Sequence, residues 1–286
     1  MGTYAVTGSA SGMGGAVARK LREGRHTVIG VDIKSADIVA DLSTPTGRRG
    51  AAADVLAACA GALDGAVLAA GRGPTSGAER LITEVNYFGV VELLQAWQPA
   101  LARAESAKVV VFASNSTTTV PAVPARAIRA LLDGDAEKAL RAYRMFGRYA
   151  PPIAYAASKI AVSHWVRRNA VTAQWAGAGI RLNALAPGAI MTPMMEEQLA
   201  RPSDAKAVRE FPVPIGGFGN AEQLADWVIF MLSESAEFLC GSVVFVDGGS
   251  DAYFRSDDWP RAVPARRVLS YLRRTRQFTS FERNRP

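Results

Sequence analysis

The chain has 286 residues, of which 49% are hydrophobic and 21% charged, and its mean hydropathy is +0.07. These values are typical of a globular protein with one or two domains, and they exclude a largely disordered, collagen-like or coiled-coil chain. The net charge of +7 is concentrated at the C-terminus, because residues 255–286 contain nine arginines and only three carboxylates.

Short apolar runs alternate with helix-length segments from one end of the chain to the other. The runs are apolar on both faces, which predicts strands of a buried parallel sheet at residues 3–7, 26–32, 65–69, 108–114, 180–186 and 242–247. Helices are expected between them at residues 14–23, 48–60, 79–103, 155–176 and 221–232. This alternation predicts an α/β fold, a single Rossmann-type doubly wound parallel sheet over residues 1–254, with ligands at the carboxyl ends of the strands.

Residues 121–152 interrupt the alternation and predict a helical insert. Pro124 is suited to open one helix, Asp133 and Gly134 to close it, and Asp135 to cap a second. Apolar residues recur at helical spacing on both helices: Ile128, Leu131, Leu132, Leu140, Tyr143 and Phe146. We expect the insert to border the active site and to contribute to a subunit interface, the alternative being that it packs only onto its own subunit.

The basic C-terminal extension, residues 255–286, also contains many apolar side chains. Pro264 can open a short helix on which Val268, Leu269 and Leu272 form an apolar stripe among arginines. Four aromatic residues lie in the same segment: Trp259, Tyr271, Phe278 and Phe281. Because such side chains are costly in a solvated arm, we expect docking on the protein's own body or on a neighbouring subunit. The alternatives are a membrane surface, nucleic acid or disorder.

A glycine-rich turn follows the first expected strand. Its sequence, TGSASGMG at residues 7–14, opens a helix, and Asp32 ends the second expected strand. Glycines at such a turn let the backbone approach a pyrophosphate at the helix N-terminus, and a carboxylate after the second strand can accept hydrogen bonds from ribose hydroxyls. The sequence therefore predicts a dinucleotide site. A Walker phosphate-binding loop is excluded, because no Gly-Lys dipeptide occurs.

Several polar residues are expected at the same edge of the sheet. Tyr155 and Lys159 stand four residues apart in an expected helix, so their side chains face the same way. Ser114 ends the fourth expected strand, and Asn86 lies in the helix that precedes it. The segment Pro-Gly-Ala-Ile-Met-Thr, residues 187–192, follows the fifth strand.

The order of these motifs resembles that of a known enzyme family. The chain contains, in sequence, TGxxxGxG, Asn86, Ser114, Tyr155-x-x-x-Lys159 and PGxxxT. Together they resemble the short-chain dehydrogenase/reductase family over residues 2 to about 252. The likeness extends to the segments at 30–44, 85–89 and 246–249. The family's usual NNAG motif is replaced here by Leu68-Ala69-Ala70-Gly71, which removes an Asn that supports the sheet and the adenosine end.

The resemblance implies a role for each polar residue. Tyr155 would be the general acid/base, and Lys159 would bind the nicotinamide ribose and lower the pKa of the tyrosine. Ser114 would hold the substrate oxygen, and Asn86 would position a proton-relay water. An unperturbed phenol has a pKa near ~10, so a nearby ammonium helps it to act as a base at neutral pH.

Asp32 also predicts which cofactor binds. A carboxylate at the ribose 2′-hydroxyl repels a 2′-phosphate, and Ser11 stands where a basic residue would favour NADP, so NAD is expected over NADP. Lys34 is the nearby residue that favours NADP. Asp41 would cap the adenine amine, as the resemblance implies, or lie in a solvated turn. The expected cofactor contacts are Gly8, Ser11, Gly12, Met13, Asp32, Asp41, Leu42, Ala70, Gly71, Tyr155, Lys159, Pro187, Gly188 and Thr192.

The segment at residues 191–219, rich in Met, Pro and Gly, is expected to form short helices and a substrate loop. Its apolar residues would form a wall over the nicotinamide, although packing between the two helices explains them equally well. These residues are Met191, Met194, Met195 and Phe211. Ser116 is a further candidate substrate contact.

These features predict an NAD-dependent oxidoreductase that interconverts a secondary alcohol and a ketone on an apolar, alicyclic or steroid-like substrate. A homodimer or homotetramer is expected. The alternative enzyme is a 3-oxoacyl-thioester reductase, which Asp32 disfavours because such enzymes more naturally use NADPH. The alternative from another class is a nucleotide-binding protein that contacts nucleic acid or a membrane through its basic tail, and the intact Tyr155 and Lys159 count against it.

Cysteine and histidine usage bears on location and metal binding. Cys59 and Cys240 lie far apart and outside any CxxC motif, which favours a cytoplasmic protein. His26 and His164 have no carboxylate cluster beside them, so no metal site is expected. Neither a transmembrane segment nor a signal peptide is expected, and membrane contact, if any, would be at the surface, through residues 256–286.

Overall fold

Within residues 1–278, which this computed structural model describes apart from the side chains of residues 203 and 204, seven parallel strands form one sheet. Their order is β3-β2-β1-β4-β5-β6-β9, so the chain moves outward from β1 first in one direction and then in the other. The strands are β1 (Thr3–Thr7), β2 (Thr27–Asp32), β3 (Ile38–Val39), β4 (Gly65–Leu68), β5 (Lys108–Phe112), β6 (Arg181–Pro187) and β9 (Val243–Val246). This confirms the predicted doubly wound α/β fold.

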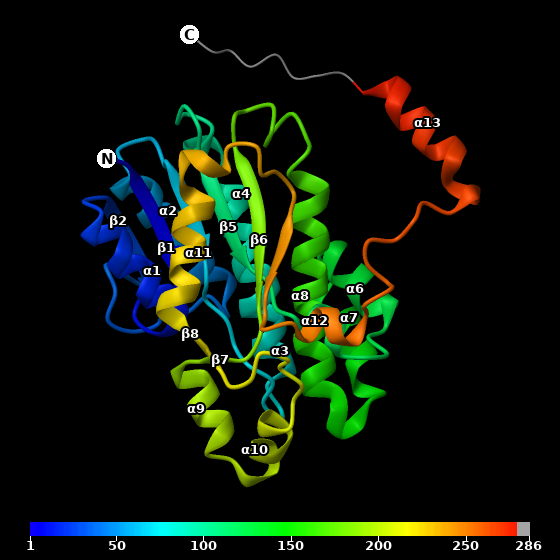
Figure 1. Cartoon of the computed structure of the whole chain (residues 1–286). Helices are drawn as coiled ribbons and strands as arrows, with labels where there is room; N and C mark the ends of the chain where they lie inside the picture. Colours follow the sequence, from blue (N-terminus) through cyan, green and yellow to red (C-terminus); the bar gives the residue numbers. More distant parts are fainter. Residues whose placement is uncertain (279–286) are drawn as a thin grey trace.

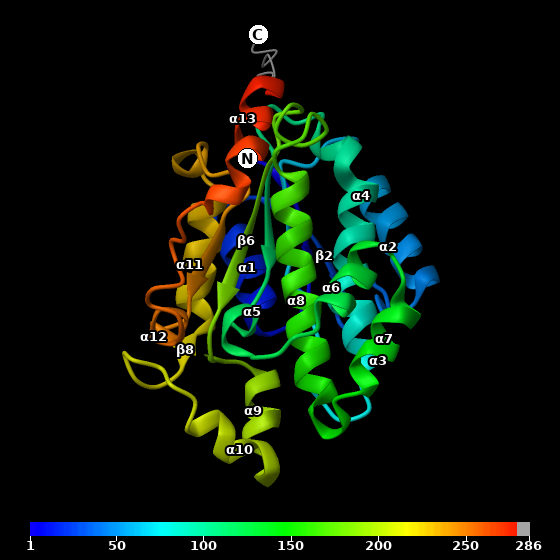
Figure 2. The ribbon, with the colours of Figure 1, turned by 90° about the vertical axis from the view of Figure 1, so that its right-hand side faces the viewer.

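Helices cover both faces of the sheet. The helices α1 (Gly12–Glu23) and α11 (Ala221–Leu232) pack together on one face, whereas α2 (Pro45–Ala58), α4 (Gly89–Leu101) and α8 (Ala150–Asn169) cover the other (Figures 1 and 2). Each layer buries its own apolar cluster against the strands, and the cluster beneath α2, α4 and α8 is the larger. This two-sided burial explains why the strands are apolar on both faces.

Shorter elements complete the described part of the chain. They are α3 (Glu79–Thr83), η1 (Glu84–Phe88), α5 (Ser116–Thr119), α6 (Ala125–Leu132), α7 (Ala136–Arg144), η2 (Gly147–Tyr149), β7 (Ile190–Met191), α9 (Pro193–Leu199), α10 (Pro202–Arg209), β8 (Gly219–Asn220), η3 (Glu234–Ala236), α12 (Ser250–Phe254), η4 (Ala265–Arg267) and α13 (Val268–Gln277). The strands β7 and β8 pair with each other, close to α9 and α10 at the carboxyl end of the large sheet (Figure 1).

Two predicted helices differ from the observed ones. The helix expected at 79–103 is divided by η1, one turn of π-helix at Glu84–Phe88. The helix expected at 155–176 begins at Ala150 and ends at Asn169. Pro151 and Pro152 fit its first turn, because N–H groups there have no partner within the helix and their loss costs little.

The helical insert forms as predicted, but its apolar stripe is not free. Pro124 precedes α6, and the side chain of Asp135 accepts a hydrogen bond from the N–H of Lys138 to cap α7. The stripe packs into the core of its own chain, where three of the six residues are buried and the others lie against them: Leu131, Leu140 and Tyr143, then Ile128, Leu132 and Phe146. These side chains therefore need no neighbouring subunit to cover them, which corrects the physical reason for expecting an interface at this insert.

The C-terminal extension turns away from the body of the molecule. The helix α13 stands apart from the body, at the end of the molecule opposite α9 and α10 (Figure 1). Val268, Leu269 and Leu272 are 47%, 81% and 50% exposed. The extension, as far as residue 278, is thus not docked on the chain's own body by this stripe. Phe281, one of the aromatic residues expected to favour docking, lies outside the described residues.

Candidate active site

The glycine-rich turn connects β1 to α1 at the carboxyl end of the sheet. Gly8 and Gly12 have φ values of +68° and +55°, a left-handed conformation that favours glycine. A Cβ on Gly8 would lie 2.8 Å from the backbone nitrogen of Ala70, and one on Gly14 would collide with the carbonyl oxygen of Gly8. The turn therefore packs directly against the loop that follows β4, which only glycine permits.

The N-terminus of α1 is suited to an anion. Among the described residues no acidic side chain lies in its first turn, and the N-cap residue Ser11 makes no side-chain capping hydrogen bond. Met13 packs against the core beneath α1. Because the first N–H groups of a helix need acceptors and carry a partial positive charge, this end of α1 fits a pyrophosphate.

Asp32 is held beside this turn by backbone donors. One of its carboxylate oxygens accepts a hydrogen bond from the N–H of Ala10 (3.0 Å), and the other accepts one from the N–H of Ile33 (2.7 Å). The carboxylate at the end of β2 is thereby fixed next to the start of α1. Ser11 and Lys34 are exposed at its side.

The turn at Asp41 and Leu42 follows β3. The exposed Asp41 accepts a hydrogen bond from the N–H of Ser43 (2.9 Å) in a local turn, and Leu42 is buried. Asp41 was expected either to cap the adenine amine or to lie in a solvated turn. The structure shows the exposed position and the local hydrogen bond of a solvated turn.

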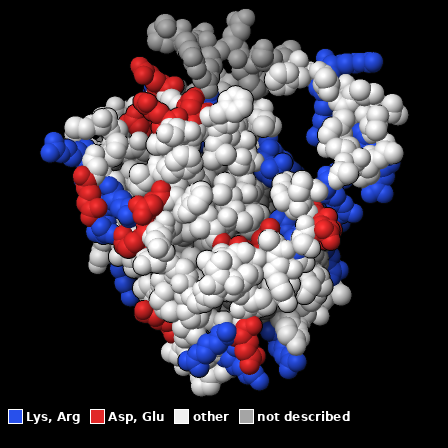
Figure 3. Space-filling view, in the orientation of Figure 1, with Lys and Arg blue, Asp and Glu red and all other residues white. Residues whose placement is uncertain are grey.

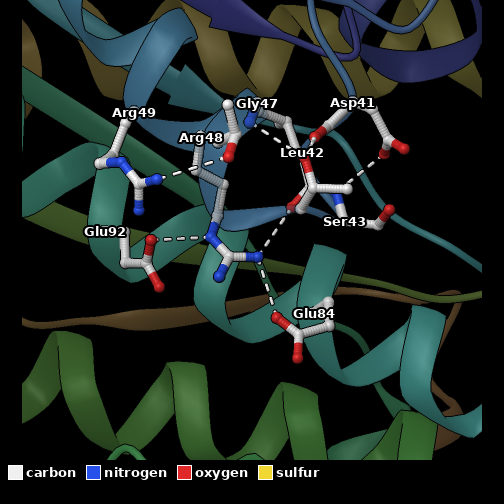
Figure 4. Close-up of polar contacts among 10 residues, drawn as sticks. Asp41, Leu42, Ser43, Gly47, Arg48, Arg49, Glu84 and Glu92 are labelled. Atoms are coloured by element: carbon white, nitrogen blue, oxygen red, sulfur yellow. Dashed lines mark hydrogen bonds and ion pairs between the residues drawn. The ribbon is translucent and has the colours of Figure 1, made fainter.

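A buried arginine connects this turn to the rest of the site (Figure 4). Arg48 is only 3% exposed, and its Nη1 donates to the carbonyl oxygen of Leu42 (3.1 Å) and to Glu84 (2.9 Å), while its Nε donates to Glu92 (2.7 Å). Glu84 begins the π-helical turn that carries Asn86. Sequence reasoning missed Arg48, because a single arginine in an expected helix reads as a solvated residue.

The four polar residues predicted from the sequence lie together at the carboxyl edge of β4 and β5. The Lys159 Nζ donates to the carbonyl oxygen of Phe112, at the end of β5, over 2.6 Å. The Ser114 side chain lies close enough to the Tyr155 phenol to lower its pKa. A Cβ on Gly71 would lie 3.3 Å from the Asn86 Oδ1 and 3.9 Å from the Lys159 Nζ, so Asn86 and Lys159 border the same glycine.

Asn86 fixes the loop that follows β4. Its Oδ1 accepts a hydrogen bond from the N–H of Arg72 (2.7 Å), and its Nδ2 donates to the carbonyl oxygen of Arg72 (3.0 Å). The Asn86 side chain is fully buried within the π-helical turn. Such turns occur frequently at functional sites, and this one places the amide against the loop beside Lys159.

Burial shifts the pKa values of Tyr155 and Lys159 in opposite directions. Burial raises the pKa of the Tyr155 phenol above its ordinary value, and the neighbouring Ser114 side chain opposes this increase only in part. Burial lowers the pKa of Lys159 to about 8. At neutral pH the phenol therefore holds a proton that it can donate, and the neighbouring lysine remains mostly charged.

The segment after β6 lies next to the glycine-rich turn. Pro187 ends β6, and Gly188 packs closely on the backbone of Asp247. Thr192 caps α9 by accepting a hydrogen bond from the N–H of Met195 (3.3 Å), and its Cβ lies 3.7 Å from where a Cβ on Gly12 would stand. The start of α9 thus borders the expected phosphate position.

The candidate substrate contacts are only partly brought together. Met191 and Met194 are 37% and 38% exposed, and the Met194 sulfur approaches the loop after β4 at Gly73. Phe211 packs instead against Phe254 of α12, with ring centroids 5.9 Å apart. Packing between α9 and α10 therefore does not bury Met191 and Met194.

Ser116 lies beside Ser114 and has an unused hydrogen-bonding group. Its N–H donates to the Ser114 Oγ (3.1 Å), whereas its own buried hydroxyl has no hydrogen-bond partner among the described residues.

Within the described residues, no group of His, Cys, Asp and Glu side chains could hold a metal ion. No helix between residues 1 and 278 is long and apolar enough to cross a membrane.

Comparisons with known proteins agree with this arrangement. Residues 138–251 match a family model described as enoyl-(acyl carrier protein) reductase. The chain is 36% identical over 255 residues to the 3-alpha-hydroxysteroid dehydrogenase/carbonyl reductase of Comamonas testosteroni, which covers 89% of this chain and 98% of the relative. It is 31% identical to the cis-4-hydroxycyclohexanecarboxylate dehydrogenase of Sinomonas cyclohexanicum, over 86% of this chain and 95% of the relative.

A solved structure is similar as well. The crystal structure of the 3-alpha-hydroxysteroid dehydrogenase from Pseudomonas sp. B-0831, complexed with NADH, superposes with a TM-score of 0.84 at 43% sequence identity. The match covers 89% of this chain and 99% of that one.

Proposed function

The chain belongs to the short-chain dehydrogenase/reductase family, and we propose that it is an NAD(H)-dependent enzyme that interconverts a secondary alcohol and a ketone on an apolar, alicyclic substrate. The observation that carries this proposal is the convergence of Tyr155, Ser114 and Lys159 beside the loop that follows β4. The names of two similar enzymes support the substrate class, since each describes a hydroxyl group on a saturated ring.

The residues around the glycine-rich turn fit NAD(H). The turn at Gly8 and Gly12 and the N-terminus of α1 would hold the pyrophosphate, and Asp32 would hold the adenosine ribose. Lys159 would hold the second ribose. The cofactor supplies the hydride acceptor or donor when bound. Because Asp32 is fixed as an anion beside the turn, a 2′-phosphate there would be repelled, which favours NAD(H) over NADP(H).

The side chains of the site would handle the proton. In reduction, the Tyr155 hydroxyl donates its proton to the carbonyl oxygen of the substrate, and in oxidation the phenolate takes a proton from the alcohol. The Ser114 hydroxyl donates a hydrogen bond to the same oxygen. The Lys159 ammonium favours the phenolate through its charge. Asn86 borders Gly71 together with Lys159 and would hold a relay water there.

Substrate screening tests the proposal. Oxidation and reduction are followed by NAD(P)H absorbance with hydroxysteroids, cyclic alcohols, quinones and a 3-oxoacyl thioester, each with both cofactors. We expect the highest kcat/KM with a cyclic alcohol or its ketone and a preference for NAD(H) of roughly tenfold or more. Fastest turnover of the acyl thioester with NADPH would instead establish the thioester reductase.

Asp32→Ala is the matched variant for the cofactor assignment. It removes the carboxylate but leaves the glycine-rich turn in place, so the preference for NAD(H) should narrow. An unchanged ratio of kcat/KM between the two cofactors would place the carboxylate away from the ribose.

We also propose a homodimer or homotetramer located in the cytoplasm. Trp227 and Phe230 are exposed on α11 and contact each other edge to face, an unusual pair to leave in water. Cys59 and Cys240 are both free thiols, as suits a reducing compartment. Light scattering of the full chain tests the assembly, and a monomer would contradict it.

A further inference from the structure

The helix α13 carries an apolar face that the described chain leaves uncovered. Val268, Leu272 and Thr275 are spaced by four and three residues, so they share one face of the helix, with Leu269 and Tyr271 at its two sides. All five are exposed. In Figure 3 the helix, at the upper right, shows a continuous white surface between its charged groups.

All the charged side chains of the helix and of the segment that leads to it are basic. Residues 259–278 contain six arginines and no Asp or Glu. Arg273 and Arg274 lie on the side opposite Val268 and Leu272, whereas Arg276 lies between Leu272 and Leu269. Figure 3 accordingly shows blue but no red on this helix. Its partner must therefore offer negative charge and apolar surface together.

We propose that α13 binds the surface of an anionic phospholipid bilayer. Its apolar face would enter the boundary between headgroups and acyl chains, while the arginines would reach the lipid phosphates, with the apolar stem of Arg276 lying between Leu272 and Leu269. Ten residues of helix are about 15 Å long, too short to cross a bilayer and suited to lying in its plane.

Nucleic acid and a second copy of this chain each match only part of these features. Nucleic acid would neutralise the arginines but leave Val268, Leu269 and Leu272 in water. A second copy of this chain would need an acidic surface to receive six arginines, whereas residues 1–254 have nearly balanced charge. Stable protein interfaces also bury about 800 Å² on each partner, more than a ten-residue helix face readily offers.

The extension begins at α12, which contacts α5 near the candidate site, and only α13 lies far from the catalytic groups. Arg255 pairs with Asp251 of α12 and stacks over the rings of Phe245 in β9 and Trp259. The helix then lies at the end of the molecule away from α9 and α10 (Figures 1 and 2). Membrane contact through α13 therefore leaves the candidate active site open, and the two activities can be tested separately.

Sedimentation with vesicles tests the proposal. The probes are vesicles of phosphatidylcholine alone and of phosphatidylcholine with an equal part of phosphatidylglycerol. We compare the full chain with a chain ending at Arg255, with Leu269→Ser/Leu272→Ser, and with Arg273→Gln/Arg274→Gln/Arg276→Gln. The matched control is Arg49→Gln/Lys138→Gln/Arg141→Gln, which removes three charges from exposed positions on the body.

We expect the full chain and the control to bind the anionic vesicles, and each helix variant to bind them roughly tenfold more weakly or worse. NADH binding should be equal in all five proteins, which verifies that each is folded. Equal vesicle binding by the chain that ends at Arg255 would overturn the proposal. So would full binding by the leucine variant, or release of the full chain from vesicles by an equal concentration of duplex DNA phosphate.

Discussion

At the scale of single residues, the candidate site combines the partly buried Tyr155 with the buried Lys159, and burial shifts their pKa values in opposite directions. Tyr155 is pushed toward its protonated form and Lys159 toward its neutral form. At neutral pH the phenol therefore keeps a proton that it can donate, while the lysine is still mostly charged. Ser114 adds a hydroxyl beside the phenol.

Tyr155→Phe should separate chemistry from binding. The variant lacks the proton donor but keeps the ring, so kcat should fall by roughly a hundredfold to ten-thousandfold while the Kd for NADH changes little. Steady-state turnover and fluorescence titration with NADH measure the two quantities. Turnover at the wild-type rate would remove Tyr155 from the mechanism.

The lowered pKa of Lys159 predicts how the stability of the ligand-free protein depends on pH. Its folded pKa of about 8 lies below the ordinary value of 10.5, so the unfolded chain binds more protons between these values, and this group makes the fold more stable as the pH rises through that window. The gain over the whole window should be on the order of 3 kcal/mol. Urea unfolding should show it in the wild type and not in Lys159→Met; the same pH dependence in both proteins would contradict the assignment.

At the scale of elements, the sequence predicted the strands, the main helices and the convergence of the polar residues, because two-sided apolar runs and the Tyr155–Lys159 spacing report directly on local structure. The π-helical turn at Glu84–Phe88 was missed, since the apolar pattern from Ile82 to Val90 continues through it. The covering of the insert was also missed, since periodicity identifies an apolar face but not its neighbour.

Arg48 connects three segments that lie far apart in the sequence. It joins the turn at Leu42, the first residue of the π-helical turn and Glu92 of α4, so its loss removes a donor from each and leaves two carboxylates unpaired. Arg48→Met should lower the free energy of unfolding by about 2–4 kcal/mol, and it should weaken NADH binding because the Asp41–Leu42 turn loses its support.

The neighbouring Arg49 provides the control for this variant. It is exposed and makes a long contact with Thr46, so Arg49→Met should change stability by less than about 0.5 kcal/mol. Urea unfolding and NADH titration compare the two variants. Equal small effects would show that the Arg48 contacts do not support the turn.

At the scale of the whole molecule, a polar cluster joins the amino ends of β5 and β6 to the segment at η3. Glu237 accepts a hydrogen bond from Ser106 (2.7 Å) and pairs with Arg181 (2.8 Å) and Lys108 (3.3 Å), both of which are buried. The sheet is thus held by polar contacts at one end, whereas the candidate site occupies the other.

This cluster predicts an acid-sensitive contribution to stability. Partial burial alone would raise the pKa of Glu237, but the hydrogen bond from Ser106 and the charges of Arg181 and Lys108 outweigh it, so the pKa lies below its ordinary value of 4.5. The stabilisation is present above that value and is lost as the pH falls below it. The Tm difference between wild type and Glu237→Gln should shrink on acidification; a constant difference would contradict the assignment.

The position of Thr192 beside Gly12 has a consequence for how ligands influence each other. The same short segment that begins α9 borders the expected phosphate position and carries Met194 toward the loop after β4. Any ligand that changes the arrangement of this segment changes the affinity at the other position, and thermodynamic linkage makes the two effects equal. If the cofactor tightens alcohol binding by some factor, the alcohol must tighten cofactor binding by that same factor.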